Sequence, residues 1–384
     1  MINLELNYVI ECSDVNKIKN SWKLYKKSWG HSLHRICSRI CSFPPSLAYF
    51  FVKNFSKKGD VCLDVFSGKG TFPLEAMLNE RIAIGNDIAP DAFILTNAKL
   101  NPPDVDKYIE YLDELKGKMG FLSTTKGVNK NIRIFFGTKT LKQILEIREL
   151  LMDDESQFGI FSKALMCGIL HGKSSISLSL PCSHSYSMAP SYVRKYAKKH
   201  GLKKPRRDVI ECLKIKAKTV LKDPIPPRFN SKAFNYDSRN LPLKEESVDL
   251  IVTSPPYFDV QTYAYDNWLR LWFLGYDYRE VRKNIVQTGS EKLYKEFMSE
   301  SLVEMYRVLK KNRRCFIIVG DVKKKYANYE KIINTAEFLS KPAQKAGFKV
   351  ERIIRDSIPQ CNKVLNSSLN TEGITTERIL CLRK

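Results

Sequence analysis

The segment Thr253-Ser-Pro-Pro-Tyr257 carries residue types suited to chemistry on a flat, amino-bearing ring. It follows an apolar run, Leu250 to Val252, that predicts a buried parallel strand. Two consecutive prolines fix φ and supply no N–H, so the neighbouring carbonyls are held at set angles. These acceptors could hold an exocyclic amino group while Tyr257 stacks on the ring. The alternative is a strand-to-loop turn that contains Pro-Pro for structural reasons alone.

A second segment, Asp60 to Thr71, predicts a buried strand (Val61 to Val65), a glycine turn and a helix. Glycines let a ligand approach the backbone, and a helix N-terminus offers free N–H groups. The turn is not a Walker phosphate loop, because Lys69 lies between two glycines. It is not a complete G-x-G-x-x-G either, because the third residue after Gly70 is Pro73. The segment therefore predicts the first strand–turn–helix unit of a nucleotide-type sheet.

Acidic residues follow two further predicted strands. The strand Ile82 to Asn86 stops at Asp87, about twenty residues past the glycine turn, where a carboxylate can accept hydrogen bonds from two ribose hydroxyls. Ile88 could pack on an adenine face. The sheet resumes at Ala233, and the Asp237 carboxylate could accept an adenine amino group.

Apolar periodicity predicts the elements that position these segments. Alternation from Leu4 to Ile10 indicates an edge strand, and the rings of the aromatic helix Gln261 to Gly275 are expected to lie mostly in the core. The other predictions are helices at Leu47–Phe55, Leu141–Met152, Phe161–Leu170 and Leu293–Leu309, strands at Ser174–Leu180 and Cys315–Val319, and a closing antiparallel pair at Val350–Ile354 and Arg378–Leu382.

Composition bounds the class of protein. At 384 residues and 43% hydrophobic content, the chain can form two modest domains or one α/β domain with a large insertion. The net charge of +23 indicates a polyanionic partner. The ten cysteines include no C-x-x-C pair, and the N-terminus does not resemble a secretory leader, which together predict reduced thiols. No apolar run approaches membrane-spanning length. These features predict a soluble, cytoplasmic protein without membrane contact. His31, His34, Cys37 and Cys41 fit one face of a short helix, so we predict no metal site.

The positive charge is concentrated in the middle of the chain. Residues 116 to 232 hold 24 Lys and Arg against 8 Asp and Glu, and the rhythm of alternating strands and helices is absent there. From Arg194 to Lys222 twelve basic residues accompany only Asp208 and Glu211, with Tyr192 and Tyr196 among them. A solvated helix face usually carries both signs of charge, so this stretch predicts a nucleic-acid-facing surface. Its expected contact residues are Arg194, Lys195, Lys198, Lys199, Lys203, Lys204, Arg206 and Arg207.

Two segments carry a family resemblance. Asp64-Val-Phe-Ser-Gly-Lys-Gly-Thr71 resembles the F-x-G-x-G cofactor motif of S-adenosylmethionine-dependent amino-methyltransferases that act on DNA, and Thr253-Ser-Pro-Pro-Tyr257 resembles their catalytic motif. The similarity covers roughly residues 31 to 100 and 230 to 384. It implies a cofactor pocket for S-adenosyl-L-methionine formed by Phe43, Asp64, Phe66, Gly68, Gly70, Thr71, Asp87, Ile88 and Asp237.

The resemblance also implies the fold and its division. We expect an α/β, Rossmann-like class I methyltransferase sheet with a large, mostly helical basic insertion. Residues 1–115 would form an N-terminal arm and the cofactor-binding half, residues 116–232 the insertion that recognises the target, and residues 233–384 the catalytic half. One departure is that the insertion precedes Asp237, whereas the family's alpha-type order normally places it after the equivalent acidic loop.

The implied chemistry is methyl transfer to a flipped base. Ser254 Oγ and the Pro255 carbonyl would accept hydrogen bonds from the target amine, the Pro255-Pro256 pair would hold the turn rigid, and Tyr257 would stack on the base. In-line transfer then depends on positioning and preorganised dipoles rather than on a strong base or a metal. No Pro-Cys nucleophile motif is present, which argues against carbon-5 methylation of cytosine.

Serine before Pro-Pro-Tyr is typical of family members that methylate N4 of cytosine, whereas aspartate or asparagine is typical of those that methylate N6 of adenine. Site-specific N4-cytosine methylation of double-stranded DNA is the prediction, with N6-adenine as the alternative. An RNA base amino-methyltransferase and a non-catalytic nucleic-acid-binding module are two further alternatives. A cognate restriction endonuclease would be a partner of a modification enzyme; the oligomeric state is not predicted.

Overall fold

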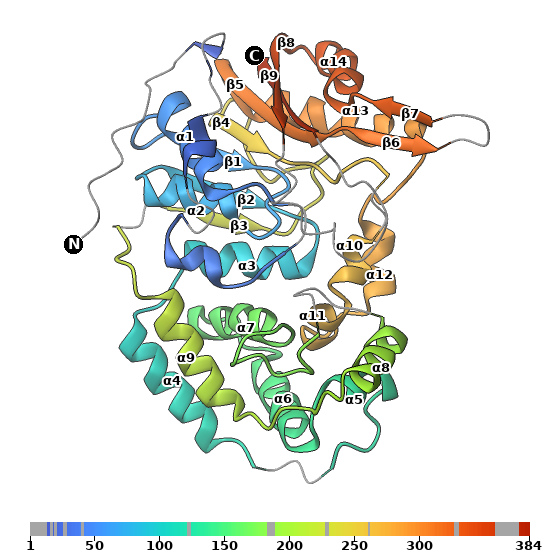
Figure 1. Ribbon diagram of the computed structural model, residues 1–384. Coiled ribbons are helices and arrows are strands. Elements are labelled where there is room, and N and C mark those ends of the chain that lie inside the picture. Colours follow the sequence, from blue (N-terminus) through green and yellow to red (C-terminus); the bar gives the residue numbers. More distant parts are fainter. Residues whose placement is uncertain are drawn as a thin grey trace.

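A seven-stranded sheet forms the centre of the computed structural model (Figure 1), which describes residues 14–15, 18, 21–25, 29–39, 42–120, 124–182, 189–226, 230–259, 262–325, 330–357 and 376–384. The strand order is β3-β2-β1-β4-β5-β9-β8. The strands are β1 (Val61–Asp64), β2 (Ile82–Asn86), β3 (Lys232–Phe234), β4 (Val248–Thr253), β5 (Leu309–Gly320), β8 (Lys349–Ser357) and β9 (Thr376–Arg383).

The direction of the strands confirms the predicted fold class. β3, β2, β1, β4 and β5 are parallel, whereas β9 runs antiparallel to both β5 and β8, as predicted for the closing pair. The chain winds outward from β1 through β2 to β3 and then returns to β4 on the other side of β1. In doubly wound sheets the carboxyl ends of the strands at such a reversal leave a crevice.

Helices cover both faces of the sheet. α1 (Pro45–Phe55), α2 (Thr71–Leu78) and α3 (Pro90–Leu100) share a core with Leu250 and Val252 of β4, while α13 (Glu291–Val308) and α14 (Thr335–Lys345) share a second core with Ile251. Successive side chains of a strand point to opposite faces, so β4 must be apolar on both. All six residues of β4 are buried.

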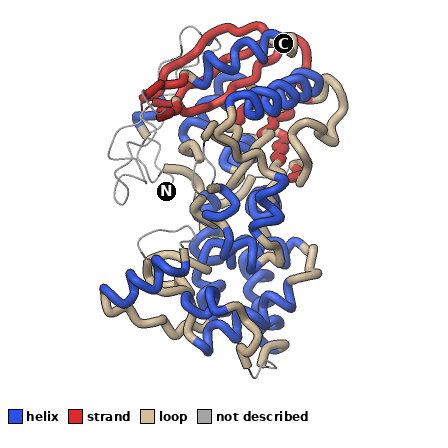
Figure 2. The backbone as a smooth tube through the Cα atoms, turned by 90° about the vertical axis from the view of Figure 1, so that its right-hand side faces the viewer, coloured by secondary structure: helices blue, strands red, loops and turns tan. Residues whose placement is uncertain are grey.

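A helical lobe lies between α3 and β3 in the chain. It consists of α4 (Val105–Gly117), α5 (Lys130–Phe135), α6 (Thr138–Leu151), α7 (Gln157–Ile169), α8 (Pro190–Lys199) and α9 (Val209–Val220). The lobe lies below the sheet in Figure 1, and Figure 2 shows the strands gathered away from it. Its helix α7 packs on α3 and shares the first core, and α4 packs on α9. Helix α4 spans residue 116, so the lobe begins before the expected boundary of the insertion.

Two sequence predictions were wrong. The expected aromatic helix is instead α10 (Tyr263–Asp266) and α11 (Trp268–Phe273), because Asn267 leaves helical geometry and its side-chain amide donates to the Tyr263 carbonyl at 2.8 Å. A third helix, α12 (Tyr278–Asn284), follows. The expected strand from Ser174 to Leu180 is irregular, because its backbone N–H groups bond to helix ends: Leu178 donates to the Ile169 carbonyl.

The remaining elements are small. β6 (Val322–Lys325) and β7 (Glu330–Ile333) form a separate antiparallel ribbon. A short 3-10 helix at Ser32–Arg35 and another at Ser21–Leu24 lie near the N-terminus. The predicted edge strand from Leu4 to Ile10 lies outside the described residues. No helix in the described ranges is long and apolar enough to cross a membrane.

Candidate active site

A cleft opens at the carboxyl ends of β1, β2 and β4, where the strand order reverses. Residues from both sequence motifs line it, although the motifs are far apart in the chain. The predicted site residues in its wall are Phe43, Phe66, Gly68, Thr71, Asp87, Ile88, Asp237, Ser254, Pro255 and Pro256. Three others, Asp64, Gly70 and Tyr257, are not among the residues that line it.

Two glycines shape the turn after β1. Gly68 and Gly70 have φ values of +53° and +73°, in the left-handed region that favours glycine. At Gly70 a Cβ would also lie 2.9 Å from the Thr96 Oγ1 atom, so a side chain does not fit. Gly70 therefore shapes the turn, and α2 begins directly after it. The buried Thr71 Oγ1 at the first helical position has no hydrogen-bond partner among the described residues, which leaves a hydroxyl for a ligand in the cleft.

Asp87 joins the glycine turn to the end of β2. Its Oδ2 atom accepts a hydrogen bond from the Gly68 N–H at 2.8 Å, and its Oδ1 atom accepts one from the Ala89 N–H at 2.9 Å. Burial raises the pKa of the Asp87 carboxyl group, while the nearby Arg39 opposes that rise. A carboxylate offers about four acceptor positions, so two remain for ribose hydroxyls.

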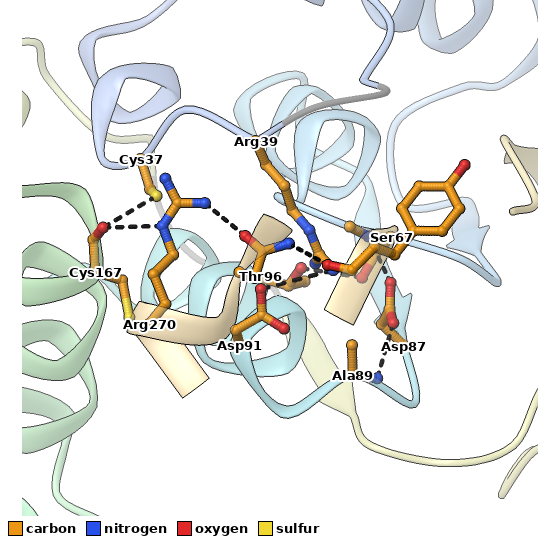
Figure 3. Close-up of polar contacts among 12 residues, drawn as sticks. Cys37, Arg39, Ser67, Asp87, Ala89, Asp91, Thr96, Cys167 and Arg270 are labelled. Atoms are coloured by element: carbon orange, nitrogen blue, oxygen red, sulfur yellow. Dashed lines mark hydrogen bonds and ion pairs between the residues drawn. The ribbon is translucent and has the colours of Figure 1, made fainter. Parts of the chain in front are cut away.

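Arg39 is a cleft residue that sequence reasoning missed. Its guanidinium group lies 3.6 Å from the Asp91 carboxylate and points into the same polar cluster as Ser67 and Asp87 (Figure 3). Burial lowers the pKa of Arg39, but Asp91 and Asp87 outweigh that effect and raise it. No motif marks position 39, and the only sequence signal is one basic residue shortly before Phe43.

Asp64 does not line the cleft. It connects the glycine turn after β1 with the loop from Thr253 to Tyr257 after β4. It is 1% exposed, and its Oδ1 atom accepts hydrogen bonds from the Thr253 hydroxyl at 2.6 Å and from the Phe66 N–H at 3.2 Å. The Phe66 N–H also donates to the Thr253 Oγ1 atom. Burial raises the pKa of Asp64 to about 7, against the lowering effect of these hydrogen bonds. Asp64 thus ties the end of β1 to the start of the catalytic motif.

Three residues of the loop from Thr253 to Tyr257 line the cleft: Ser254, Pro255 and Pro256. Within the described part of the chain no hydrogen bond engages the Ser254 hydroxyl or the Pro255 carbonyl, whereas the Pro256 carbonyl accepts one from the Tyr294 hydroxyl at 3.1 Å. Ser254 and Pro255 are therefore available as acceptors for an incoming amine. This is the pair predicted from the sequence to hold the target amine.

Tyr257 is anchored at both ends. Its N–H donates to the Tyr263 hydroxyl at 2.9 Å, and its own hydroxyl donates to Glu377 Oε1 at 2.7 Å. The side chain is only 8% exposed. Its predicted stacking on a base stays a prediction.

Asp237 lies at the cleft, but its carboxylate is already engaged. Arg239 pairs with it at 2.7 Å, and that hydrogen bond lowers the pKa of Asp237. The expected contact with an adenine amino group therefore has to share this carboxylate with Arg239. Further lining residues that carried no motif are Tyr236, Tyr263, Asn284, Ile285, Val286 and Phe297.

The histidines and cysteines near the N-terminus have structural partners. His34 Nε2 lies 2.7 Å from Glu75 Oε1, His31 Nδ1 accepts from the Leu33 N–H, and Cys37 is buried against α7. Cys41 lies outside the described residues. Among the residues that the structure describes, no cluster of three His, Cys, Asp or Glu side chains has the arrangement of a metal site.

The predicted nucleic-acid contacts lie on and after α8. Six of them have exposed side chains and form no ion pair with a described residue: Arg194, Lys195, Lys198, Lys199, Lys203 and Arg206. The other two have structural roles. Lys204 donates to the Arg133 carbonyl, and the backbone of the half-buried Arg207 exchanges hydrogen bonds with the Thr140 hydroxyl.

A doubly wound sheet with a cleft at its switch point, lined by a glycine turn and an acidic strand end, defines a class of proteins that bind nucleotide-like cofactors. The chain belongs to the DNA methylase family, whose model matches residues 5–97 and 248–384. Both motif turns lie in the matched segments, and the helical lobe does not.

Individual relatives are distant. The Type II methyltransferase M.MjaII of Methanocaldococcus jannaschii is 29% identical over 123 residues, which are 32% of this chain and 22% of that protein. The chain thus matches about a fifth of the length of this curated relative.

Two solved structures share the fold only loosely. A Thermus thermophilus protein named as a putative DNA modification methylase, complexed with S-adenosyl-L-methionine, is 21% identical with a TM-score of 0.26, covering 38% of this chain and 51% of that one. The rRNA methyltransferase aviRa of Streptomyces viridochromogenes is 10% identical with a TM-score of 0.33, covering 95% and 93%. At these values they add nothing to what the sheet order shows.

Proposed function

We propose that the chain is an S-adenosyl-L-methionine-dependent methyltransferase that modifies the N4 amino group of cytosine in double-stranded DNA. The observation that carries this proposal is the meeting of two groups of residues in one cleft. A glycine turn with an acidic strand end lies on one side, and the acceptors Ser254 and Pro255 lie on the other. Family membership supports action on DNA.

The residues present fit this cofactor. Asp87 keeps two acceptor positions for ribose hydroxyls, Ile88 offers an apolar surface for adenine, and the unpartnered Thr71 hydroxyl and the Lys69 ammonium group suit the charged amino-acid end. When bound, S-adenosyl-L-methionine supplies an electrophilic methyl group. In the proposal Asp64 keeps the two halves of the cleft in register through Thr253.

The chain's own contribution to the reaction is positioning. The Ser254 hydroxyl and the Pro255 carbonyl would accept hydrogen bonds from the target amine and direct its nitrogen lone pair along the line of attack. Because hydrogen bonds at Pro256 and Tyr257 hold the loop backbone before substrate arrives, little reorganisation of the Pro255 carbonyl is needed during the reaction. A duplex substrate would have to extrude the target nucleotide to reach them.

Basic residues on α8 would bind the phosphate backbone. Arg194, Lys195, Lys198 and Lys199 are exposed on this helix, and no acidic residue lies between positions 189 and 207. Such a one-sign surface favours a polyanion. A modification methyltransferase of this kind would act in the cytoplasm beside a cognate restriction endonuclease.

The test is transfer of a tritiated methyl group to duplex DNA and, in parallel, to total RNA, with mass spectrometry of the product nucleosides. N4-methylcytosine in DNA is the expected product. N6-methyladenine in DNA would overturn the assigned base, and label in RNA alone would overturn the assigned nucleic acid. If neither is labelled, and calorimetry shows no cofactor binding, the proposed methyl transfer is rejected and the non-catalytic nucleic-acid-binding module is favoured instead. The S254A variant should lose transfer while its cofactor affinity stays within about threefold of wild type, since Ser254 contacts the amine side.

A further inference from the structure

Glu377 is an acidic residue on a core-facing position. It lies near the start of β9, where alternate residues share a face. Ile379 and Cys381, which share its face, belong to the core cluster that also contains Trp22 and helix α1. An apolar residue would be expected at position 377. Burial raises the pKa of the Glu377 carboxyl group, and burying such a group without a partner is costly.

The partner of Glu377 is the aromatic residue of the catalytic motif. The Tyr257 hydroxyl donates to Glu377 Oε1 at 2.7 Å across a sequence separation of 120 residues. On β8, Asp356 is the cross-strand neighbour of Glu377, and Trp22 Nε1 and Lys23 both bond to Asp356. The second carboxylate is therefore engaged elsewhere, and Glu377 is the one that faces Tyr257.

Glu377 forms one of three hydrogen bonds that hold the end of the loop from Thr253 to Tyr257. Tyr294 donates to the Pro256 carbonyl, the Tyr263 hydroxyl accepts from the Tyr257 N–H, and Glu377 accepts from the Tyr257 hydroxyl. Tyr294 lies on α13, Tyr263 on α10 and Glu377 on β9, so three separate elements hold the loop. A phenylalanine would stack on a base as well as a tyrosine does. The hydroxyl therefore matters for where the ring is held.

We infer that Glu377 is a positioning residue for methyl transfer: it fixes the orientation of the side chain of Tyr257, which follows the acceptors Ser254 and Pro255 in the same loop, before substrate binds. The inference rests on the proposed function, because it assigns the ring to the target base. A tyrosine already held at its backbone N–H and at its side-chain hydroxyl loses little freedom on binding. Misplacement by about 1 Å is enough to slow a reaction about 100-fold.

The first experiment compares kcat for methyl transfer among E377L, E377Q, Y257F and the double variant E377L/Y257F. E377Q keeps an acceptor oxygen and should stay within about threefold of wild type. E377L and Y257F should each lower kcat by about 10- to 100-fold with KM for duplex little changed, and the double variant should lose no more than either. Wild-type kcat in E377L, or fully additive losses in the double variant, would overturn the inference.

A matched control removes a carboxylate from the adjacent strand. Glu351 on β8 pairs with Arg314 at 2.7 Å and does not contact Tyr257, so E351L should keep wild-type kcat. If E351L loses as much activity as E377L, the effect is a general weakening of the β8–β9 edge and the positioning role is rejected. Urea unfolding of E377L and E351L measures how far each substitution lowers the stability of the protein.

A readout that needs no activity separates this inference from the proposed function. In protein labelled with ¹³C at tyrosine Cζ, the Tyr257 resonance is assigned by its loss in Y257F. It should shift in E377L and stay near its wild-type position in E351L. An unmoved resonance in E377L overturns the inference even if the enzyme is active. If the resonance shifts in E377L but the wild-type protein methylates no nucleic acid, the contact between Glu377 and Tyr257 is supported and the proposed function is rejected.

Discussion

Replacing Asp64 by asparagine tests whether the carboxyl group that joins the two motif turns titrates as its burial requires. Burial raises the pKa of Asp64 to about 7 in the folded protein, whereas an aspartate in an unfolded chain has a pKa of about 3.9. The folded protein thus binds this proton more tightly than the unfolded chain. The free energy of unfolding must therefore fall as the pH rises from the unfolded pKa toward the folded one.

The size of the effect follows from the two pKa values. With about 3.9 unfolded and about 7 folded, ionisation of the unfolded chain lowers stability by about 1.5 kcal/mol at about pH 5 and by about 4 kcal/mol at about pH 8.5. The D64N variant has no proton to lose, and its amide oxygen can still accept from Thr253 and Phe66. Between these pH values the free energy of unfolding of the wild type should therefore fall by about 2 to 3 kcal/mol more than that of D64N.

The assay is urea denaturation, followed by circular dichroism at half-unit steps of pH. Only the difference between wild type and variant is compared, so that other titrating groups cancel. The D113N variant, at an exposed position where the carboxylate pairs with Lys214, is measured in parallel as the control for removing a carboxylate outside the cleft. A constant difference between wild type and D64N would refute the reasoning, since it would mean that Asp64 does not change protonation in the folded protein.

Three further predictions concern charge and backbone. The K195E/K199E variant should bind duplex DNA more weakly, and the slope of log K against log salt should become shallower by about 2, measured by fluorescence anisotropy; an unchanged slope would remove α8 from the interface. In G168A the new Cβ would lie 1.9 Å from the Ile36 carbonyl oxygen, so urea unfolding should show a loss of about 1 to 3 kcal/mol, and an unchanged stability would contradict the close contact. Gly117 is exposed in α4 with nothing within 4 Å of an added Cβ, so G117A should gain about 0.5 to 1 kcal/mol, whereas a loss would contradict the open space.

The sheet was predictable because its strands are apolar on both faces and end in recognisable turns. β1, β2 and β4 lie within a residue or two of their predicted bounds, since a buried parallel strand leaves a continuous apolar run. The closing pair β8 and β9 was also found. The segment from Ser174 to Leu180 shows the limit of this reasoning. Its alternating apolar residues are typical of a strand, but backbone N–H groups within it donate to carbonyls at helix ends instead of to a neighbouring strand. Only the tertiary contacts decide between these two outcomes.

The site was predictable where a residue's type is fixed by local geometry. Gly70 needs its positive φ, and Asp87 follows a strand end, so both carry a sequence signal. Arg39 and Glu377 carry none, because their importance comes from partners far away in the chain, Asp91 and Tyr257. Asp64 was recognised as part of a motif, but its contact with Thr253 depends on how β1 and β4 pair.

The residues that line the cleft and the residues that carry the excess positive charge lie in different parts of the chain. Every residue that lines the cleft lies between positions 39 and 89 or between 236 and 297, and none comes from the helical lobe. The excess positive charge lies in the stretch that holds most of this lobe, with 24 basic against 8 acidic residues from 116 to 232. The lobe nevertheless shares one continuous core with α1, α2 and α3, so the basic stretch is packed against the part of the chain that forms the cleft. A duplex bound along α8, as proposed, would have its position relative to Ser254 set by this packing.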